Sequence, residues 1–206
     1  MQVDTITVGP FESNCFIVSN DRHEALVIDP GDEPDRIIAA LRAGDWSVQA
    51  ILVTHGHIDH VTGLAAVEQA FPVPIAMHPT DAAWAFGPSN QMPPYYGPPP
   101  APSGIARSLA EGQEWTDLGY RYEVWELPGH APGHVGFYFP EQRAMFSGDV
   151  LFQGSMGRVD LPGCDPAAMQ QSLQRMAQLP DDTTVYCGHG PATTIGREKR
   201  YNPFLQ

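Results

Sequence analysis

The chain is poor in basic residues and in cysteine, and it has no long apolar segment. Its 206 residues include 11 Lys and Arg against 24 Asp and Glu, which gives a formal net charge of −13. Nucleic-acid binding depends on a basic surface, so this balance argues against a nucleic-acid partner. No apolar run approaches the length of a membrane span, and we therefore expect no membrane association.

The three cysteines are Cys15, Cys164 and Cys187. They are too few and too irregularly spaced for a disulfide framework or a paired-cysteine metal site. The run around Cys187 is apolar, which favours a buried, inert thiol over a ligand or a nucleophile. The first residues also lack a basic segment followed by an apolar core, so we expect no secretory signal. These features predict a reducing, cytoplasmic compartment.

Strand-like and helix-like patterns alternate in two comparable halves of the chain. Strands are expected at residues 3–8, 15–19, 25–29, 50–53, 74–77, 120–127, 135–139, 143–147 and 183–187. Helices are expected at residues 34–43, from about residue 60, and at 165–179. This alternation predicts a layered α/β fold. We expect one domain over residues 1–206, with halves of roughly 1–104 and 105–206.

Residues 87–104 interrupt this alternation with a proline-rich stretch around Tyr95 and Tyr96. Proline at this density can continue neither a helix nor a central strand. A domain linker is one alternative, although the second half shows no signature of an independent domain. We predict a semi-rigid lid over a functional site. Tyr95, Tyr96 and the preceding Trp84 are candidate substrate-binding residues, but a merely packed loop would show the same residues.

The most informative segment covers residues 54–60, with the sequence THGHIDH, and follows the apolar run at 50–53. A buried strand that ends in a histidine-rich loop directs several ligand-type side chains to one point at the sheet edge. Imidazole and carboxylate groups suit zinc, iron or manganese. Four such residues this close together exceed what one tetrahedral ion takes from a single segment, which favours two metal ions.

Three later segments share one pattern, in which a β-type run is followed by a ligand-type residue beside glycine. They lead to His130 and His134, to Asp149, and to His189. Glycine next to a ligand lets the backbone approach closely or adopt a positive φ. These residues extend the candidate site beyond the local histidine motif.

With these motifs the chain resembles the metallo-β-lactamase superfamily. Within it, the chain is most similar to the short glyoxalase II-like hydrolases that lack a C-terminal helical domain. The resemblance includes THGHIDH and the later ligand segments, together with IDPG at 28–31, GDVLF at 148–152, GSMGR at 154–158 and GHGP at 188–191. It therefore covers nearly the whole chain, and it implies a four-layer αββα sandwich.

The resemblance also implies a site for two divalent metal ions, with zinc preferred and iron or manganese as alternatives. The implied ligands are His55, His57 and His134 for the first ion, Asp59, His60 and His189 for the second, and Asp149 as a bridge. A carboxylate can span two cations, whereas a neutral imidazole normally serves one. His130 competes with His134, and the family pattern favours His134. Asp29 is expected to support a metal-binding histidine.

The function implied by the resemblance is hydrolysis of thioesters of small 2-hydroxy acids, such as S-lactoylglutathione. A metal lowers the pKa of its bound water, to about 7 at catalytic zinc, and the hydroxide would attack the thioester carbonyl. Asp59 is the expected catalytic residue because it can orient that hydroxide. The expected partner is a small-molecule thioester, and the protein is expected to be a monomer or a small homo-oligomer.

Substrate recognition departs from the pattern of the larger glyoxalase II enzymes. Arg158 matches a basic residue that they carry after the bridging aspartate, and we predict that it binds a carboxylate of the substrate. An ion pair between Arg158 and Asp160 is the alternative. Asp160 stands where those enzymes carry an aromatic residue, and Pro191 stands where they carry a tyrosine. Glutathione is therefore not established as the thiol.

Two other functions stay open from the sequence. A persulfide dioxygenase of the same fold would use a single iron held by His55, a His134-type ligand and Asp149. Metal content and oxygen consumption would separate it from a hydrolase. A non-catalytic metal protein is the third possibility, which the complete set of ligand-type residues disfavours.

Overall fold

Strand-forming segments in the first half of the chain build one six-stranded sheet of order β1-β2-β3-β4-β5-β6. Its strands are β1 (Gln2–Val8), β2 (Ser13–Ser19), β3 (Glu24–Ile28), β4 (Ser47–Leu52), β5 (Ile75–Met77) and β6 (Arg107–Ser108). The first three strands pair antiparallel, whereas β3 to β6 pair parallel. Parallel strands need crossover connections, and the helices of this half supply them.

The second half builds another six-stranded sheet, of order β14-β13-β10-β9-β8-β7. Its strands are β7 (Glu114–Asp117), β8 (Tyr120–Glu126), β9 (Val135–Phe139), β10 (Ala144–Gly148), β13 (Thr184–Cys187) and β14 (Thr193–Thr194). Only β10 and β13 pair parallel. A small hairpin of β11 (Leu151–Phe152) and β12 (Ser155–Met156) follows β10.

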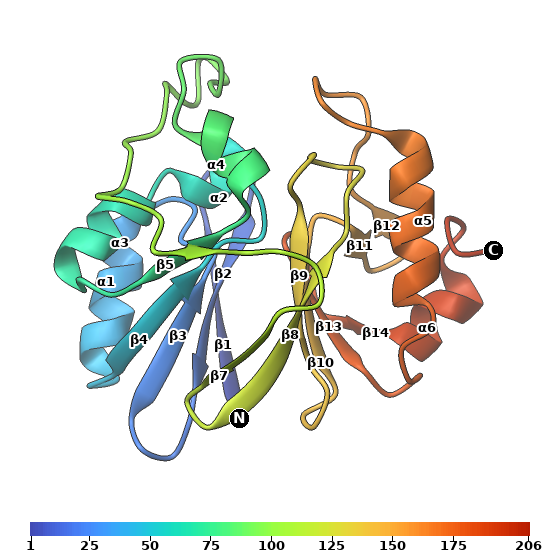
Figure 1. Cartoon of the computed structure of the whole chain (residues 1–206), viewed down its shortest axis with the longest axis horizontal. Coiled ribbons are helices and arrows are strands. Elements are labelled where there is room, and N and C mark those ends of the chain that lie inside the picture. Colours follow the sequence, from blue (N-terminus) through green and yellow to red (C-terminus); the bar gives the residue numbers. More distant parts are fainter.

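Six helices complete the computed structural model, which describes residues 1–206 (Figure 1). They are α1 (Pro34–Ala43), α2 (Ile58–Val61), α3 (Leu64–Ala70), α4 (Pro79–Ala85), α5 (Pro166–Met176) and α6 (Ile195–Tyr201). In Figure 1, α1 and α3 lie outside the first sheet, and α5 and α6 lie outside the second. Helix α5 begins as its sequence predicts, because the Asp165 side chain accepts hydrogen bonds from the amides of Ala167 and Ala168.

Three apolar clusters hold the four layers together. One joins helices α1 and α3 to the first sheet through residues such as Ile37 and Leu64. The second lies between the sheets and includes Leu52 and Phe146. The third packs α5 against the second sheet through residues such as Leu173. Each sheet is therefore buried on both faces, which explains the nearly continuous apolar strands of the sequence.

The predicted four-layer αββα sandwich is confirmed, with differences in its smaller elements. The short strands β6, β7, β11, β12 and β14 were not predicted, because two to four residues carry little periodicity. The seven-residue helices α4 and α6 were also not predicted, since two turns give only a weak helical pattern. The first sheet extends beyond the predicted division at residue 104, since β6 pairs with β5. No helix is both long and apolar enough to cross a membrane.

The ends of several strands meet at one edge of the sandwich. Strands β8, β10 and β13 run in the same direction, so the segments that follow them leave the second sheet on the same side. The first sheet joins them there, because the amide of Val135 donates a hydrogen bond of 2.8 Å to the carbonyl of Thr54. This arrangement brings the histidine motif after β4 to the loops that carry the later candidate ligands.

Candidate metal centre

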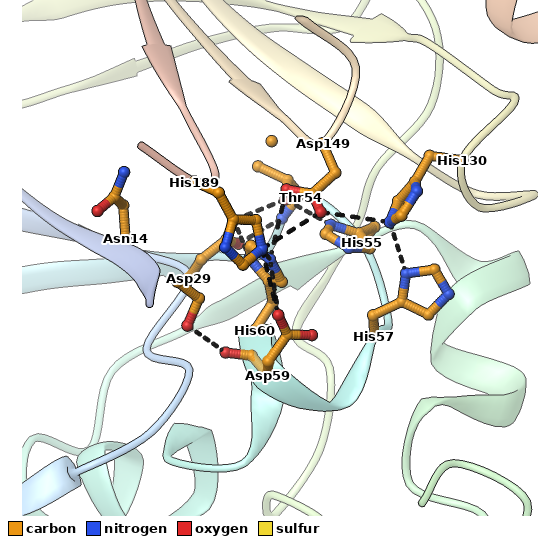
Figure 2. Close-up of polar contacts among 12 residues, drawn as sticks. Asn14, Asp29, Thr54, His55, His57, Asp59, His60, His130, Asp149 and His189 are labelled. Carbon is orange, nitrogen blue, oxygen red and sulfur yellow. Dashed lines mark hydrogen bonds and ion pairs between the residues drawn. The ribbon is translucent and has the colours of Figure 1, made fainter. Parts of the chain in front are cut away.

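The start of the histidine motif is fixed by a buried carboxylate. Asp29 accepts hydrogen bonds from the amide (2.7 Å) and the hydroxyl (2.6 Å) of Thr54. Its Oδ2 also lies 3.2 Å from Nδ1 of His60 (Figure 2). This contact leaves Nε2 of His60 facing the centre of the site. Asp29 thus stands beside a candidate metal-binding histidine, as predicted.

The first donor group consists of His55, His57 and His130, whose ligand nitrogens lie within 4.8 Å of one another. Nδ1 of His57 and Nε2 of His130 are 2.7 Å apart, and Nε2 of His55 is buried without a hydrogen-bond partner. Burial lowers the pKa of His57 to about 4 and lowers that of His55 well below its ordinary value. Both imidazoles are therefore neutral at pH 7, which is the form that binds metals.

The structure corrects the predicted choice between His130 and His134. Nδ1 of His130 lies 2.8 Å from the carbonyl oxygen of Arg158, which can only accept a hydrogen bond, so Nε2 keeps its lone pair toward the centre. Nε2 of His134 instead accepts a hydrogen bond of 3.0 Å from the Asp149 amide. His134 stacks behind His55 and is 1% exposed. His134 therefore supports the site from behind, and His130 takes the ligand position that the sequence had assigned to His134.

The second donor group consists of Asp59, His60 and His189. Oδ2 of Asp59 is 3.2 Å from Nε2 of His189, which in turn lies 3.3 Å from Nε2 of His60. Burial by itself would lower the pKa of both histidines, but the nearby carboxylates of Asp59 and Asp149 outweigh it. They raise the pKa of His60 to about 9 and that of His189 to about 11. Without metal, this group therefore holds protons in the place of a cation.

Asp149 lies between the two groups, in the position predicted for a bridge (Figure 2). Its Oδ2 is 3.4 Å from Nε2 of His130 and 3.4 Å from Nε2 of His189. Its Oδ1 is 3.5 Å from Nε2 of His60 and has no hydrogen-bond partner. The backbone must come close here, because a Cβ on Gly188 would lie 2.1 Å from that Oδ1. Glycine is therefore required beside the predicted bridge.

The chemistry of these donors fits two divalent cations. Neutral imidazoles and ionised carboxylates converge, and two buried ligand atoms, Nε2 of His55 and Oδ1 of Asp149, are otherwise unsatisfied. Buried polar atoms of this kind need a partner. Asp29, His55 and His60 form a third geometric grouping. We discount it because both oxygens of Asp29 already accept hydrogen bonds from Thr54.

Asp81 on helix α4 is a supporting residue that the sequence did not reveal. Its fully buried carboxylate accepts hydrogen bonds from the amides of Gly56 (2.8 Å) and Gly133 (2.7 Å) and from Nε1 of Trp84 (3.2 Å). Gly56 separates His55 from His57, and Gly133 precedes His134. Asp81 therefore ties the first histidine loop to the second. An aspartate in a first helical turn carries no sequence signature for such a role.

The predicted substrate-binding residues take different places. Arg158 lines a cavity of about 380 Å³ beside the metal centre, together with Asp59 and His57. Tyr95 and Tyr96 line neither this cavity nor its neighbour. Both tyrosines pack against Phe11, and the Tyr96 hydroxyl donates a hydrogen bond of 3.0 Å to Asp32. The proline-rich loop instead presents Met92 to the cleft.

The Metallo-beta-lactamase superfamily model matches residues 8–189, which include both donor groups. The chain belongs to the metallo-β-lactamase superfamily. It is 36% identical to hydroxyacylglutathione hydrolase GloC of Haemophilus influenzae, over 100% of this chain and 98% of that protein. This relationship agrees with the glyoxalase II-like subgroup predicted from the motifs.

Solved structures of this superfamily show the same architecture. The structure of TTHA1623 in a di-iron-bound form has a TM-score of 0.87 and 43% identity, over 98% of this chain and 100% of that one. The structure of the B3 metallo-β-lactamase BLEG-1 has a TM-score of 0.94 and 35% identity, over the full length of both chains.

Substitution of the two competing histidines tests the corrected ligand set. The wild-type protein should contain about two divalent ions per chain after reconstitution, and His130→Ala should contain about one. His134→Gln should keep about two, because a glutamine oxygen can still accept the Asp149 amide. Elemental analysis of the folded proteins measures this directly. The reverse pattern would restore His134 as the ligand.

Asp81→Asn should weaken metal binding by roughly 10- to 100-fold, the range seen when a residue that orients a ligand is replaced. An amide side chain offers one acceptor oxygen, so it cannot accept from both Gly56 and Gly133. Competition with a chromophoric chelator measures the affinity, and circular dichroism checks the fold. Asp35→Asn on the exposed face of α1 is the matched control and should change neither. An unchanged metal affinity in Asp81→Asn would show that the loops hold their positions without it.

Proposed function

We propose that the protein is a metal-dependent hydrolase of thioesters of small 2-hydroxy acids, of the S-lactoylglutathione type. The observation that carries this proposal is the pair of donor groups joined at Asp149, which opens into a cleft through Asp59. The similarity to a hydroxyacylglutathione hydrolase over nearly its whole length supports the thioester as substrate. Two bound divalent ions would activate water and polarise the thioester carbonyl.

The residues of this chain would hold and orient the reactants. Asp59 remains an ionised carboxylate, because the charges of His60 and His189 lower its pKa although burial alone would raise it. Its side chain faces the cleft, where it can accept a hydrogen bond from the attacking water. The Ser13 hydroxyl donates a hydrogen bond of 2.7 Å to the Asp59 carbonyl and so fixes this segment.

The overall reaction requires only water as a second reactant. The oxygen of water bonds to the carbonyl carbon, the carbon–sulfur bond breaks, and the products are a hydroxy acid and a thiol. The thiolate is a good leaving group, so no strong protein acid is needed beside it. In agreement with this, the residues that line the cleft beside the donor groups include no lysine, cysteine or tyrosine that could act as such an acid.

A persulfide dioxygenase of this fold is the alternative that the sequence left open. It would need one iron, whereas the structure offers a complete second group in Asp59, His60 and His189. This second group favours the hydrolase. Two iron atoms per chain would not by themselves support the dioxygenase. Oxygen consumption with a persulfide substrate would support it. The cytoplasmic compartment, the oligomeric state and the lack of a nucleic-acid partner stay predictions from the sequence.

A substrate panel with metal-loaded protein tests the proposed function. S-lactoylglutathione should be hydrolysed, and Asp149→Ala should lower kcat/KM by at least about 100-fold, the scale for loss of one electrostatic partner of the transition state. The panel includes a β-lactam, because BLEG-1 is a B3 metallo-β-lactamase. Hydrolysis of the β-lactam without hydrolysis of any thioester would overturn the proposal. Full activity in folded Asp149→Ala would show that Asp149 does not act as the bridging ligand in the proposed reaction.

Arg158 and Asp160 offer a paired test of substrate capture. The Arg158 guanidinium donates hydrogen bonds of 2.6 and 2.8 Å to Asp160, and both side chains are more than half exposed. If Arg158 binds a substrate carboxylate, Asp160 competes for it. Arg158→Ala should raise KM for S-lactoylglutathione roughly two- to fivefold, and Asp160→Ala should lower it, as expected for an exposed ion pair. A neutral thioester should show neither change, and proportional changes in both substrates would assign Arg158 to the fold.

A further inference from the structure

The cleft beside the metal centre has two lobes of different character. The first lobe is the cavity of about 380 Å³ that contains Arg158, and the second is a cavity of about 420 Å³ lined by Trp84. The two lobes share His57, Asp59, Met92 and Leu161, so they meet at the metal centre. A substrate whose carbonyl lies at the metals can therefore extend into both lobes, with one half in each.

The charges of the two lobes differ. The first lobe contains a cation, Arg158, beside polar Ser155, although apolar side chains such as Phe152 and Met156 also line it. The second lobe has no charged side chain other than the shared His57 and Asp59. Its apolar walls include Trp84, Met92 and Leu161, and its uncharged polar residues are Ser89, Asn90 and Gln91. A carboxylate placed there would lose water without gaining a lysine or arginine partner, whereas an apolar group would gain from burial.

We infer that the second lobe binds an apolar side chain on the acyl half of the substrate. The inference rests on the proposed function and narrows its substrate class. The thiol half, which carries carboxylates in a glutathione thioester, belongs in the first lobe with Arg158. The acyl half then lies against Met92 and Trp84. The preferred substrates are 2-hydroxyacyl thioesters with a branched or aromatic side chain in place of the methyl group of lactate.

The walls of the second lobe are held in place by buried hydrogen bonds. Asn90 is 8% exposed, and its side-chain amide donates to the carbonyls of Gly56 (2.8 Å) and Ala85 (2.6 Å). Trp84 donates to Asp81. The Met92 amide donates a hydrogen bond of 2.9 Å to the carbonyl of Tyr96 within the proline-rich loop. The lobe is therefore formed before substrate arrives, which reduces the entropic cost of binding.

The size of the second lobe also separates the lactoyl group from larger acyl groups. Cavities of a few hundred Å³ are typical sites for whole small ligands. The single methyl group of a lactoyl thioester would leave most of such a space unfilled. A larger apolar side chain would displace water from the faces of Trp84 and Met92. Because this contact also stabilises the transition state, the substrate with the larger acyl group should have the higher kcat/KM.

Two thioesters of the same thiol test the inference without changing the leaving group. They are S-lactoylglutathione and S-(2-hydroxy-4-methylpentanoyl)glutathione. The larger substrate should have a kcat/KM at least about tenfold higher, the factor expected from burying about two methylene groups. Any interaction of glutathione with Arg158 is common to both substrates and cancels in the ratio. Equal values, or a preference for the lactoyl thioester, would overturn the inference.

Met92 lines both lobes, so its substitutions are combined with one residue specific to each lobe: Trp84→Phe in the second lobe should reduce the ratio, and Met156→Ala in the first lobe should not. Met92→Ala should reduce the ratio severalfold, and Met92→Trp should fill the lobe and exclude the larger acyl group while S-lactoylglutathione is still hydrolysed. Tyr201→Ala, at a side chain 68% exposed on α6, is the control and should leave the ratio unchanged. If the Met92 variants change both substrates in proportion, the residue does not contact the acyl group and the inference fails.

A binding measurement separates this inference from the proposed function. The metal-free protein is labelled with ¹³C in its methionine methyl groups and titrated with 4-methylpentanamide or propanamide, two neutral acyl analogues that need no catalysis. The Met92 signal, identified by its loss in Met92→Ala, should shift saturably with the larger amide and much less with the smaller, while the signal of Met156, which lines only the first lobe, should not shift. A shift confined to Met156 in the first lobe, or no shift, would overturn the inference. If no thioester is hydrolysed, the proposed function fails and this signal alone decides the role of the lobe.

Discussion

The carboxylate of Asp149 must stay ionised although it is almost fully buried, and the arrangement of the site depends on this constraint. Burying a charge is costly unless opposite charges or hydrogen bonds replace the lost water. Here the surrounding imidazoles of His60, His130 and His189 lower the pKa of Asp149, against the effect of burial. The same carboxylate raises the pKa of His60 and His189. Protons and metal ions are therefore alternative ways to neutralise one cluster.

The sandwich fold brings strand ends from both halves together, and this places the histidines around the buried carboxylate of Asp149. The hydrogen bond from Val135 to the Thr54 carbonyl joins the two sheets where the histidine loops leave them. Asn14 adds a second link, since its side-chain amide donates to the carbonyls of Cys187 and Gly190 beside His189. Because backbone and buried polar groups fix these loops, the donor atoms are positioned before a metal binds. Such preorganisation explains why residues that never touch a metal occupy buried positions around it.

The cleft is built differently from the donor set. Its walls come from the proline-rich loop and from residues after the hairpin of β11 and β12, which lie outside the two sheets. Loops of this kind can vary without loss of the scaffold, and specificity generally changes through them. A metal centre fixed by strand ends beside cavities shaped by loops accounts for relatives of one fold that carry different named activities. The hairpin wall is itself anchored, because the Asn202 side chain donates to the carbonyls of Phe152 and Ser155.

The sequence by itself determined the layered fold and most of the metal centre. Local spacing was sufficient for the histidine motif, since residues 54–60 follow directly from one buried strand. Repeated strand–glycine–ligand patterns were sufficient for Asp149 and His189. Helix α5 could be predicted from its cap and its apolar face, whereas strands of two residues gave too little pattern to detect.

Only the tertiary structure decided which of His130 and His134 faces the centre. The two residues share similar neighbours in sequence, and the choice depends on partners far along the chain, the Arg158 carbonyl and the Asp149 amide. The role of Asp81 could not be predicted from the sequence for the same reason, because its hydrogen bonds reach two loops that are distant in the chain. The same reason also explains why Met92, rather than Tyr95 or Tyr96, lines the cleft. Short-range patterns specify which side chains are available, but hydrogen bonds between distant segments decide where each one points.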